Sequence, residues 1–164
     1  MWRLEDLDGP RVVPGMAEAA LRDLAWLGLD WDEGPEASAA FDTETGPHAP
    51  YRQSARSGLY EQALSALARK DRLFPCRRSR RDLQSLATAP HGRDGLPPYP
   101  KKWRPARLDP DWYAALPADA ALRFRVDDGV TCFDDRVQGR VCEDTAADVG
   151  DFVLKRRDGV YAYQ

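Results

Sequence analysis

The sequence predicts an α/β fold with mixed strands, and three patterns support that class. Apolar residues recur every three or four positions in two segments, which is typical of amphipathic helices. Towards the carboxyl end the period changes to two, which is typical of half-buried strands. Glycine and proline clusters separate these segments. The strand–helix units are too few for a complete doubly wound sheet, so we expect a partial one.

Three helices are expected from their end signals and apolar faces. The first should run between Pro14, which suits a first turn, and Gly28, which suits a C-terminal stop. The second should cover residues 59–68, where apolar residues follow the helical spacing. A short third helix should start at Ser79, because Asp82 lies where a capping pair places its acid. The apolar stripe of the first helix should pack against a sheet.

The strands expected are residues 73–76, 121–126, 130–133, 152–154 and 160–163. The turn signal at residues 127–129 should join the second of these segments to the third. The turn signal at residues 157–159 should join the last two into a β-hairpin. Six prolines fall within residues 87–110, so regular structure is not expected there.

Composition limits the class of protein. The chain has 164 residues, 43% of them hydrophobic and 31% charged, which is typical of a soluble globular protein with one core. No apolar run approaches the roughly 18 residues of a membrane-spanning helix. The acidic start does not resemble a signal peptide, so we expect a cytoplasmic protein. The three cysteines are odd in number and widely spaced, which argues against a disulfide framework.

Charge is unevenly distributed, although the net charge is only -3. Residues 1–50 contain eleven acids and three bases, whereas residues 69–107 contain twelve bases and three acids. A local positive patch can attract phosphates even on an acidic molecule. A solvated, arginine-rich surface explains the same charges, and composition alone favours that simpler interpretation.

An acidic cluster near the start is the first candidate site. Glu5, Asp6 and Asp8 lie within four positions, beside Arg3 and Arg11. Carboxylates gathered at the end of a strand can bind a metal ion or an ammonium group. A capped turn with ion pairs accounts for the same residues, and composition alone favours the turn.

Several motifs together resemble a known family. They are RLEDLDGPR (residues 3–11), LRDLAWLGLDWDEGP (21–35), YRQSARSGLYEQAL (51–64), FPCRRSRRDL (74–83) and DVGDFVLKRRDGVYAYQ (148–164). In this order they resemble the glutamyl-tRNA-synthetase superfamily of class I aminoacyl-tRNA synthetases. The final stretch is most similar to the short glutamyl-queuosine tRNA(Asp) synthetases, because discriminating glutamyl-tRNA synthetases usually have proline and threonine before that tyrosine.

The resemblance implies part of a Rossmann-type class I catalytic domain with an inserted acceptor-binding-like α+β segment. Residues 1–75 and 148–164 would belong to the Rossmann-type part, and residues 76–147 to the insertion. It also implies activation of L-glutamate with ATP, with Mg²⁺ as a further cofactor, and transfer to the queuosine base at the wobble position of tRNA(Asp). No membrane partner is expected.

By residue match, the resemblance assigns a substrate pocket to the two ends of the chain. Glu5 stands where the family has the acid that helps to hold the substrate amino acid, which suits an ammonium partner. Tyr163 stands where the family has a tyrosine that lines the same pocket. The region of the basic residues approaches the tRNA in this family. The candidate tRNA contacts are Arg77, Arg78, Arg80, Arg81, Lys101, Lys102 and Arg104.

Many members of the family hold zinc with three cysteines and a tyrosine. Cys76 matches the first cysteine and Tyr99 the tyrosine, but Arg78 and Trp103 occupy the other two positions. Zinc needs about four N, S or O donors, and neither a guanidinium nor an indole is such a ligand. We therefore expect no zinc, and we expect Cys76 to be an ordinary buried residue.

The HIGH-type and KMSKS-type motifs of class I synthetases do not occur in these residues. Because those motifs stabilise charge at the α-phosphate during adenylation, residues 1–164 alone are not expected to form glutamyl-adenylate. Two alternatives remain open at this stage. The chain could belong to a discriminating glutamyl-tRNA synthetase, or it could be a non-catalytic remnant that binds tRNA.

Overall fold

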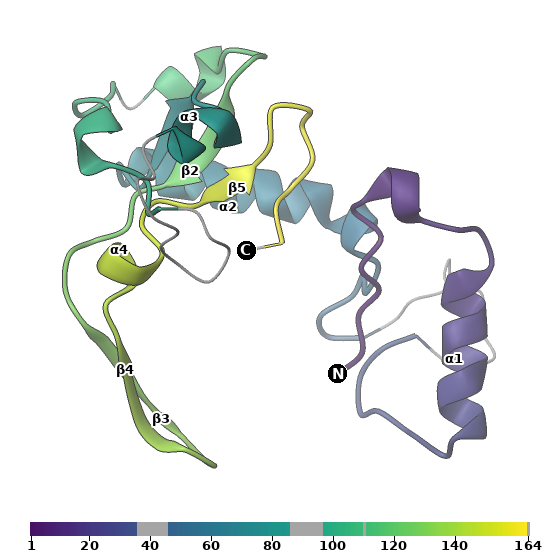
Figure 1. The fold of residues 1–164 in the computed structure, drawn as a ribbon. Coiled ribbons are helices and arrows are strands. Elements are labelled where there is room, and N and C mark those ends of the chain that lie inside the picture. Colours follow the sequence, from purple (N-terminus) through teal and green to yellow (C-terminus); the bar gives the residue numbers. More distant parts are fainter. Residues whose placement is uncertain (36–45, 86–96, 110, 164) are drawn as a thin grey trace. The chain divides into compact units, whose positions relative to one another are not determined.

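The computed structural model describes residues 1–35, 46–85, 97–109 and 111–163 (Figure 1). The chain divides into two compact units, Met1–Ala63 and Leu64–Gln164. The first is mainly helical, and the second contains both sheets. Within the described ranges, no helix is both long and apolar enough to cross a membrane.

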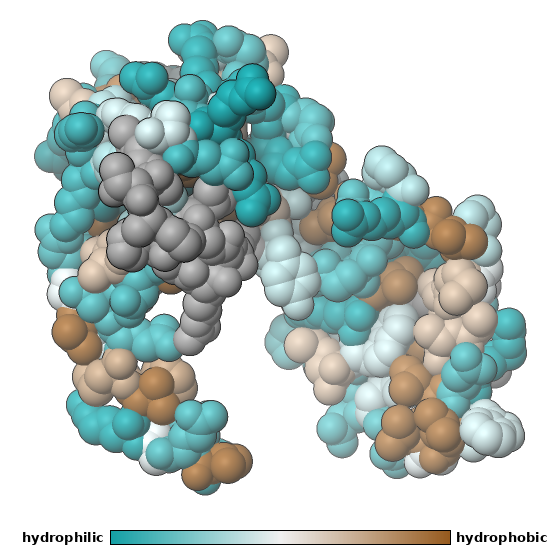
Figure 2. Space-filling view, in the orientation of Figure 1, coloured by the Kyte–Doolittle hydropathy of each residue, from teal (hydrophilic) through white to brown (hydrophobic). Residues whose placement is uncertain are grey.

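Helix α1 (Met16–Trp26) confirms the first predicted helix. Gly28 follows it with φ at 73°, a conformation that glycine adopts without steric cost, so the predicted stop is also confirmed. Only Leu21 is buried, whereas the side chains of Met16 and Trp26 are exposed. Figure 2 shows apolar groups on the surface in this part of the molecule. The expected packing of α1 on a sheet is not seen within the described part of its unit.

Helix α2 (Ser57–Arg69) confirms the second predicted helix and follows a 3-10 turn at Gln53–Arg56. Its buried residues are Leu64 and Ala68, which belong to the core of the second unit. They pack with Leu73 and Leu122, both of which are 0% exposed. The spacing of the helix therefore predicted the buried positions Leu64 and Ala68 correctly. The expected burial of Leu59 and Ala63 on the same face is wrong, because both are exposed.

The main sheet of the second unit contains β1 (Leu73–Cys76), β2 (Ala121–Phe124) and β5 (Val153–Lys155) among the described residues. Their order is β1-β2-β5, and both pairings are antiparallel. Figure 1 shows β2 and β5 side by side, with the yellow carboxyl-terminal loop beyond β5. The central strand β2 is thus paired along both edges.

Helix α3 (Arg80–Gln84) starts at the predicted capping pair. The Ser79 side chain accepts a hydrogen bond from Asp82 N, and the Asp82 carboxylate accepts one from Ser79 N. The arrangement holds Leu83 in a small second core with Phe74 and Tyr99. Lys101–Trp103 and Trp112–Ala115 form single 3-10 turns. The prediction of irregular structure over residues 87–110 partly lies outside the described residues.

The predicted hairpin at the carboxyl end is confirmed. Lys155 and Tyr161 form an antiparallel bridge beyond β5. Arg156 N donates to Val160 O at 2.8 Å, and Ala162 N donates to Leu154 O at 2.8 Å. This hairpin carries the chain to Tyr163.

The predicted pairing of residues 121–126 with residues 130–133 is wrong. Strand β3 (Thr131–Asp135) instead pairs with β4 (Gly139–Glu143) in a separate two-stranded ribbon. The physical reason is that β1 and β5 already occupy both edges of β2. The short helix α4 (Thr145–Asp148) follows the ribbon, with Asp144 as its cap.

The cysteine prediction also needs correction. Cys132 and Cys142 face each other across β3 and β4 and form a disulfide. Their separation of ten residues looked too wide in the sequence, but the turn between the strands brings their Cα atoms to 4.1 Å. Cys76 is a free and buried thiol, as expected.

Candidate functional site

The two motifs at the amino-terminal end of the chain are paired in the structure. Leu4 and Arg52 form a parallel bridge, in which Leu4 N donates to Tyr51 O and Gln53 N donates to Leu4 O, each at 3.0 Å. Extended backbone leaves its N–H and C=O groups free for such pairing. The acids that follow Leu4 are therefore placed beside the polar residues that follow Arg52.

Glu5 is oriented by a neighbour that the sequence did not reveal. Gln53 Nε2 donates a hydrogen bond to Glu5 Oε1 at 2.9 Å. The hydroxyl of Tyr60 donates to Gln53 Oε1, so the amide is held at both of its ends. Among the described residues Glu5 Oε2 has no such donor, and the side chain is exposed. The carboxylate is thus fixed along one edge and open along the other.

The neighbouring acids fit the simpler interpretation, a capped turn with ion pairs. Ser54 N and Ser54 Oγ donate to the two oxygens of Asp6 at 2.8 and 2.6 Å. Arg52 adds an ion pair at 3.9 Å, and the Asp6 side chain is only 7% exposed. Asp8 pairs with the exposed Arg11 at 3.3 Å. Asp6 is therefore closed by its partners. Glu5 and Asp8 both stay exposed, and Asp8 already has a cationic partner.

Glu5 borders an open hollow of about 610 Å³ that lies within the first unit. Its wall is formed by the segment around Glu5, by Arg52 and by the start of α1, including Met16 and Ala17. The volume falls in the usual range for small-ligand sites, roughly 300 to 1,000 Å³. The hollow therefore combines a fixed carboxylate with apolar wall residues.

A second polar cluster, centred on Glu33, holds the residues that precede Arg52. The Glu33 carboxylate accepts from His48 Nδ1 at 2.9 Å and from the Tyr51 hydroxyl at 2.8 Å. These hydrogen bonds, with that of His48 first, lower the pKa of Glu33 from its ordinary value. Tyr51 is 0% exposed, so its ring anchors the segment that leads to Gln53.

Tyr163, the second predicted pocket residue, is 89% exposed at the end of the carboxyl-terminal hairpin. It belongs to the second unit, whereas Glu5 belongs to the first. The structure describes the geometry within each unit. A pocket shared by Glu5 and Tyr163 therefore stays a prediction.

The seven candidate tRNA contacts differ in what they already bind. Arg77 pairs with Asp119 at 2.8 Å, and Lys101 pairs with Asp128, all with exposed side chains. The other exposed candidates are Arg78, Arg80, Arg81 and Lys102. Arg104 differs from all of these, because its side chain is only 17% exposed and faces the buried Asp151.

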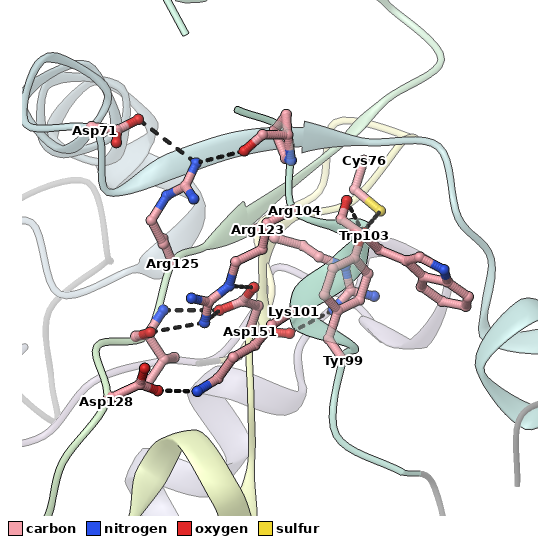
Figure 3. Close-up of polar contacts among 12 residues, drawn as sticks. Asp71, Cys76, Tyr99, Lys101, Trp103, Arg104, Arg123, Arg125, Asp128 and Asp151 are labelled. Carbon is pink, nitrogen blue, oxygen red and sulfur yellow. Dashed lines mark hydrogen bonds and ion pairs between the residues drawn. The ribbon is translucent and has the colours of Figure 1, made fainter. Parts of the chain in front are cut away.

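Asp151 is the centre of a polar network under β2 (Figure 3). Arg104 donates to it through Nε at 2.6 Å and Nη2 at 2.7 Å, and Val126 N donates at 2.9 Å. Arg123 Nη1 donates to the Asp151 carbonyl at 2.7 Å, and its guanidinium stacks over Tyr99. Because Arg104 is committed to this network, we leave it out of the proposed RNA surface.

The four family zinc positions do meet in space, but their chemistry does not fit zinc. Cys76 Sγ lies 3.4 Å from the Tyr99 hydroxyl. The Arg78 guanidinium lies 4.9 Å from the centre of the Trp103 ring, which itself packs edge-on against Tyr99 (Figure 3). Burial first, and then the hydrogen bond with Cys76, raise the pKa of Tyr99. A cation and an indole thus stand where two thiolates would be needed.

Comparison with known proteins identifies the class. All 164 residues match the family model described as tRNA synthetases class I (E and Q), catalytic domain. The chain therefore belongs to the class I aminoacyl-tRNA synthetase family that includes the glutamyl and glutaminyl enzymes. Its helices and small sheets form part of that catalytic domain.

Two relatives match almost the whole of this chain. The chain is 45% identical to a glutamyl-Q tRNA(Asp) synthetase from Symbiobacterium thermophilum, covering 99% of this chain and 48% of that protein. It is 40% identical to one from Nitratidesulfovibrio vulgaris, covering 100% of this chain and 49% of that protein. The chain thus spans about half the length of these relatives.

A solved structure supports the same fold. It is a glutamate tRNA ligase from Elizabethkingia meningosepticum in complex with its amino acid, with a TM-score of 0.70 and 26% identity. The match covers 98% of this chain and 32% of that one.

Proposed function

We propose that this protein takes part in the ATP-dependent activation of L-glutamate and in its transfer to the queuosine base of tRNA(Asp). Membership of the class I family supports an aminoacyl-tRNA-synthetase-type ligase. Two relatives that match the whole of this chain carry the name glutamyl-Q tRNA(Asp) synthetase. The DGVYAYQ ending of the sequence favours the same acceptor.

The observation that carries the proposal is the fixed carboxylate at the hollow. Gln53 holds Glu5 Oε1 and leaves Oε2 open, and the apolar start of α1 supplies a wall. A carboxylate in this position suits the α-ammonium of an amino acid, because charge-assisted hydrogen bonds are shorter and stronger than neutral ones. Fixing the acid before the ligand arrives reduces the entropy cost of binding.

Tyr163 completes the proposed pocket. Its exposed ring and hydroxyl are available to pack on the stem of glutamate and to donate a hydrogen bond. Six of the exposed bases of the second unit form the proposed tRNA surface. They are Arg77, Arg78, Arg80, Arg81, Lys101 and Lys102. Binding through such bases should weaken steeply as salt increases.

The cofactor proposal is ATP with Mg²⁺ and without zinc. In the described part of the chain, no group of three or more His, Cys, Asp or Glu residues is arranged to hold a metal ion. We therefore assign none of these residues to Mg²⁺, which usually binds substrate phosphates with only one or two carboxylates.

The cytoplasm is the proposed compartment.

Because residues 1–164 contain neither a HIGH-type nor a KMSKS-type motif, we expect no glutamate-dependent ATP–pyrophosphate exchange from them alone. Clear turnover by the purified chain would contradict that expectation. The test of function therefore uses a chimera, in which this chain replaces the matching segment of the Symbiobacterium thermophilum relative. Its glutamylation of tRNA(Asp) with queuosine should exceed that of tRNA(Asp) without queuosine and of tRNA(Glu).

Variants of the chimera test the pocket. E5Q keeps the shape of the side chain but removes its charge, so KM for glutamate should rise about tenfold to a hundredfold, as expected for a lost charged hydrogen bond. D8N is the matched control, because Asp8 lines the same hollow and already pairs with Arg11. An unchanged KM in E5Q, or an equal rise in D8N, would reject the assignment.

The two alternatives predict other outcomes. Efficient charging of tRNA(Glu) by the chimera would indicate a discriminating glutamyl-tRNA synthetase. A non-catalytic remnant would bind tRNA through the exposed bases but leave the chimera inactive. A titration with tRNA at several salt concentrations measures that binding, and no affinity even at low salt would remove the RNA surface from the proposal.

A further inference from the structure

The ribbon formed by β3 and β4 carries a disulfide that the proposed function does not use. Cys132 and Cys142 are directly opposite each other in the antiparallel register, with Cα atoms 4.1 Å apart. Both residues are exposed. The same backbone pairing accommodates two thiols or one disulfide, because the register already places the two side chains together.

The open end of this ribbon, where β3 begins and β4 ends, packs against no hydrophobic core among the described residues. Four of the five residues of β3 are exposed, and Phe133, at 53% exposure, packs no core. Two positions beyond the disulfide, Asp134 faces Arg140 in an ion pair at 3.5 Å, with side chains 80% and 68% exposed. A two-stranded ribbon without a packed face is marginally stable in water, and exposed ion pairs add little.

The turn end of the ribbon is secured independently. Asp135 Oδ1 accepts hydrogen bonds from Val137 N at 2.8 Å and from Gln138 N at 2.7 Å. Gly139 has φ at 77°, which allows the chain to turn back. At the base, Val126 is bonded to the buried Asp151. The disulfide therefore adds a covalent tie between the two strands, beside the polar contacts of the turn and of the base.

The third cysteine provides an internal contrast. Cys76 is 4% exposed, and its sulfur lies against the hydroxyl of Tyr99. Thiol–disulfide exchange requires access of one sulfur to another along the line of attack. Cys76 is closed to such attack, whereas the exposed pair is open to it.

We propose that Cys132 and Cys142 are a reversible thiol-modification site for low-molecular-weight disulfides of the glutathione class, and that their oxidation state decides whether the open end of the ribbon is ordered. One protein thiolate attacks the small disulfide, forms a mixed disulfide and releases one small thiol. The second protein thiolate then attacks the mixed disulfide and releases the other. Two electrons pass to the small disulfide, and the two protons lost by the protein thiols are taken up by the two small thiolates that are released, which become thiols. Excess reduced thiol reverses both steps.

The experiment uses the whole chain, reduced and then equilibrated with mixtures of reduced and oxidised glutathione. After alkylation of free thiols, trypsin cuts at Arg136 and Arg140 and separates the two cysteines. Oxidation should then give residues 126–136 linked to residues 141–155, while Cys76 stays reduced. Hydrogen exchange of residues 131–143 should accelerate on the order of tenfold or more on reduction, as expected when a short cross-linked loop is released. Residues 121–124 should exchange at the same rate in both forms.

Two variants complete the test. In C132S and in C142S, the amide hydrogens of the ribbon should exchange as fast as in the reduced chain. Glutathione disulfide should not change this rate, although it can form a mixed disulfide at the remaining cysteine. Failure of the linked peptides to form, or their persistence in excess reduced glutathione, would overturn the reversible site. Equal exchange of the ribbon in the oxidised and reduced chains would overturn its control of order.

Discussion

The Arg104 guanidinium donates two hydrogen bonds to the carboxylate of Asp151, from Nε at 2.6 Å and from Nη2 at 2.7 Å. The Asp151 side chain is 0% exposed, and Arg104 also donates to Val126 O. This pair joins the segment after the turn Lys101–Trp103 to the residues before β5, and Val126 adds the segment after β2. The hydrogen bonds that the guanidinium donates to Asp151 raise the pKa of Arg104 above its ordinary value.

Breaking this pair should destabilise the second unit. Asp151→Asn leaves the Arg104 charge largely buried without its partner, which costs about 3 kcal/mol or more. Urea denaturation of the full chain measures the change in the free energy of unfolding. Asp119→Asn is the matched control, because it removes the partner of the exposed Arg77 and should have little effect. Equal effects of the two variants would contradict the structural role of Asp151.

The zinc positions offer a gain-of-function prediction. The wild-type chain should bind no stoichiometric zinc, and a chelator should leave its melting temperature unchanged. The double variant R78C/W103C supplies two thiolates beside Cys76 and Tyr99, whose sulfur and hydroxyl already lie 3.4 Å apart. It should bind one zinc ion per chain, as measured by metal analysis after dialysis. Stoichiometric zinc in the wild-type protein would contradict our interpretation of Arg78 and Trp103.

The Glu33 cluster predicts a dependence of stability on pH. The pKa of Glu33 is lowered in the folded chain, so the unfolded chain binds its proton more readily. Stability from this group is therefore fully present above the unfolded pKa, about 4.3, and is lost as pH falls through the lower folded value. Comparing the wild type with E33Q between pH 7 and pH 3 measures this contribution. The gap between them should close as the solution becomes acidic, and a gap that widens would contradict the assignment.

Gln53 is expected to act as a positioning residue for Glu5. Gln53→Leu removes the donor that fixes Glu5 Oε1, so KM for glutamate in the chimera should rise about tenfold while kcat stays nearly constant. In the E5Q background the same change should add little, because the two residues act as one unit. A fully additive effect would indicate a general structural role for Gln53 instead.

The sequence predicted most local elements, because end signals and periodicity are local. The stop at Gly28 and the capping pair at Ser79 are examples, and both helices are confirmed. It failed where pairing depends on distant strands. The sequence did not show that the strand after the turn at residues 127–129 belongs to a separate ribbon. No local signal reveals that β1 and β5 pair with both edges of β2. Two cysteines placed symmetrically about Val137 were the overlooked signal.

The candidate site shows the same division. Glu5 was assigned from a motif, but its orientation depends on Gln53, which lies 48 positions away. Arg104 was grouped with exposed bases because charge alone does not reveal a buried partner. No sequence pattern indicated a role for Asp151. Its place at the centre of the polar network depends on the pairing of β2 with β5, which brings its partners together.

The central claim is that Glu5 and Tyr163 contact the same glutamate, and a crystal structure of the chimera with a non-hydrolysable glutamyl-adenylate analogue tests it most directly. We predict a Glu5 carboxylate oxygen at hydrogen-bonding distance, about 2.7 to 3.2 Å, from the α-ammonium of the ligand, with the Tyr163 ring against its side chain. A ligand that contacts only one of the two residues, or neither, would contradict the claim.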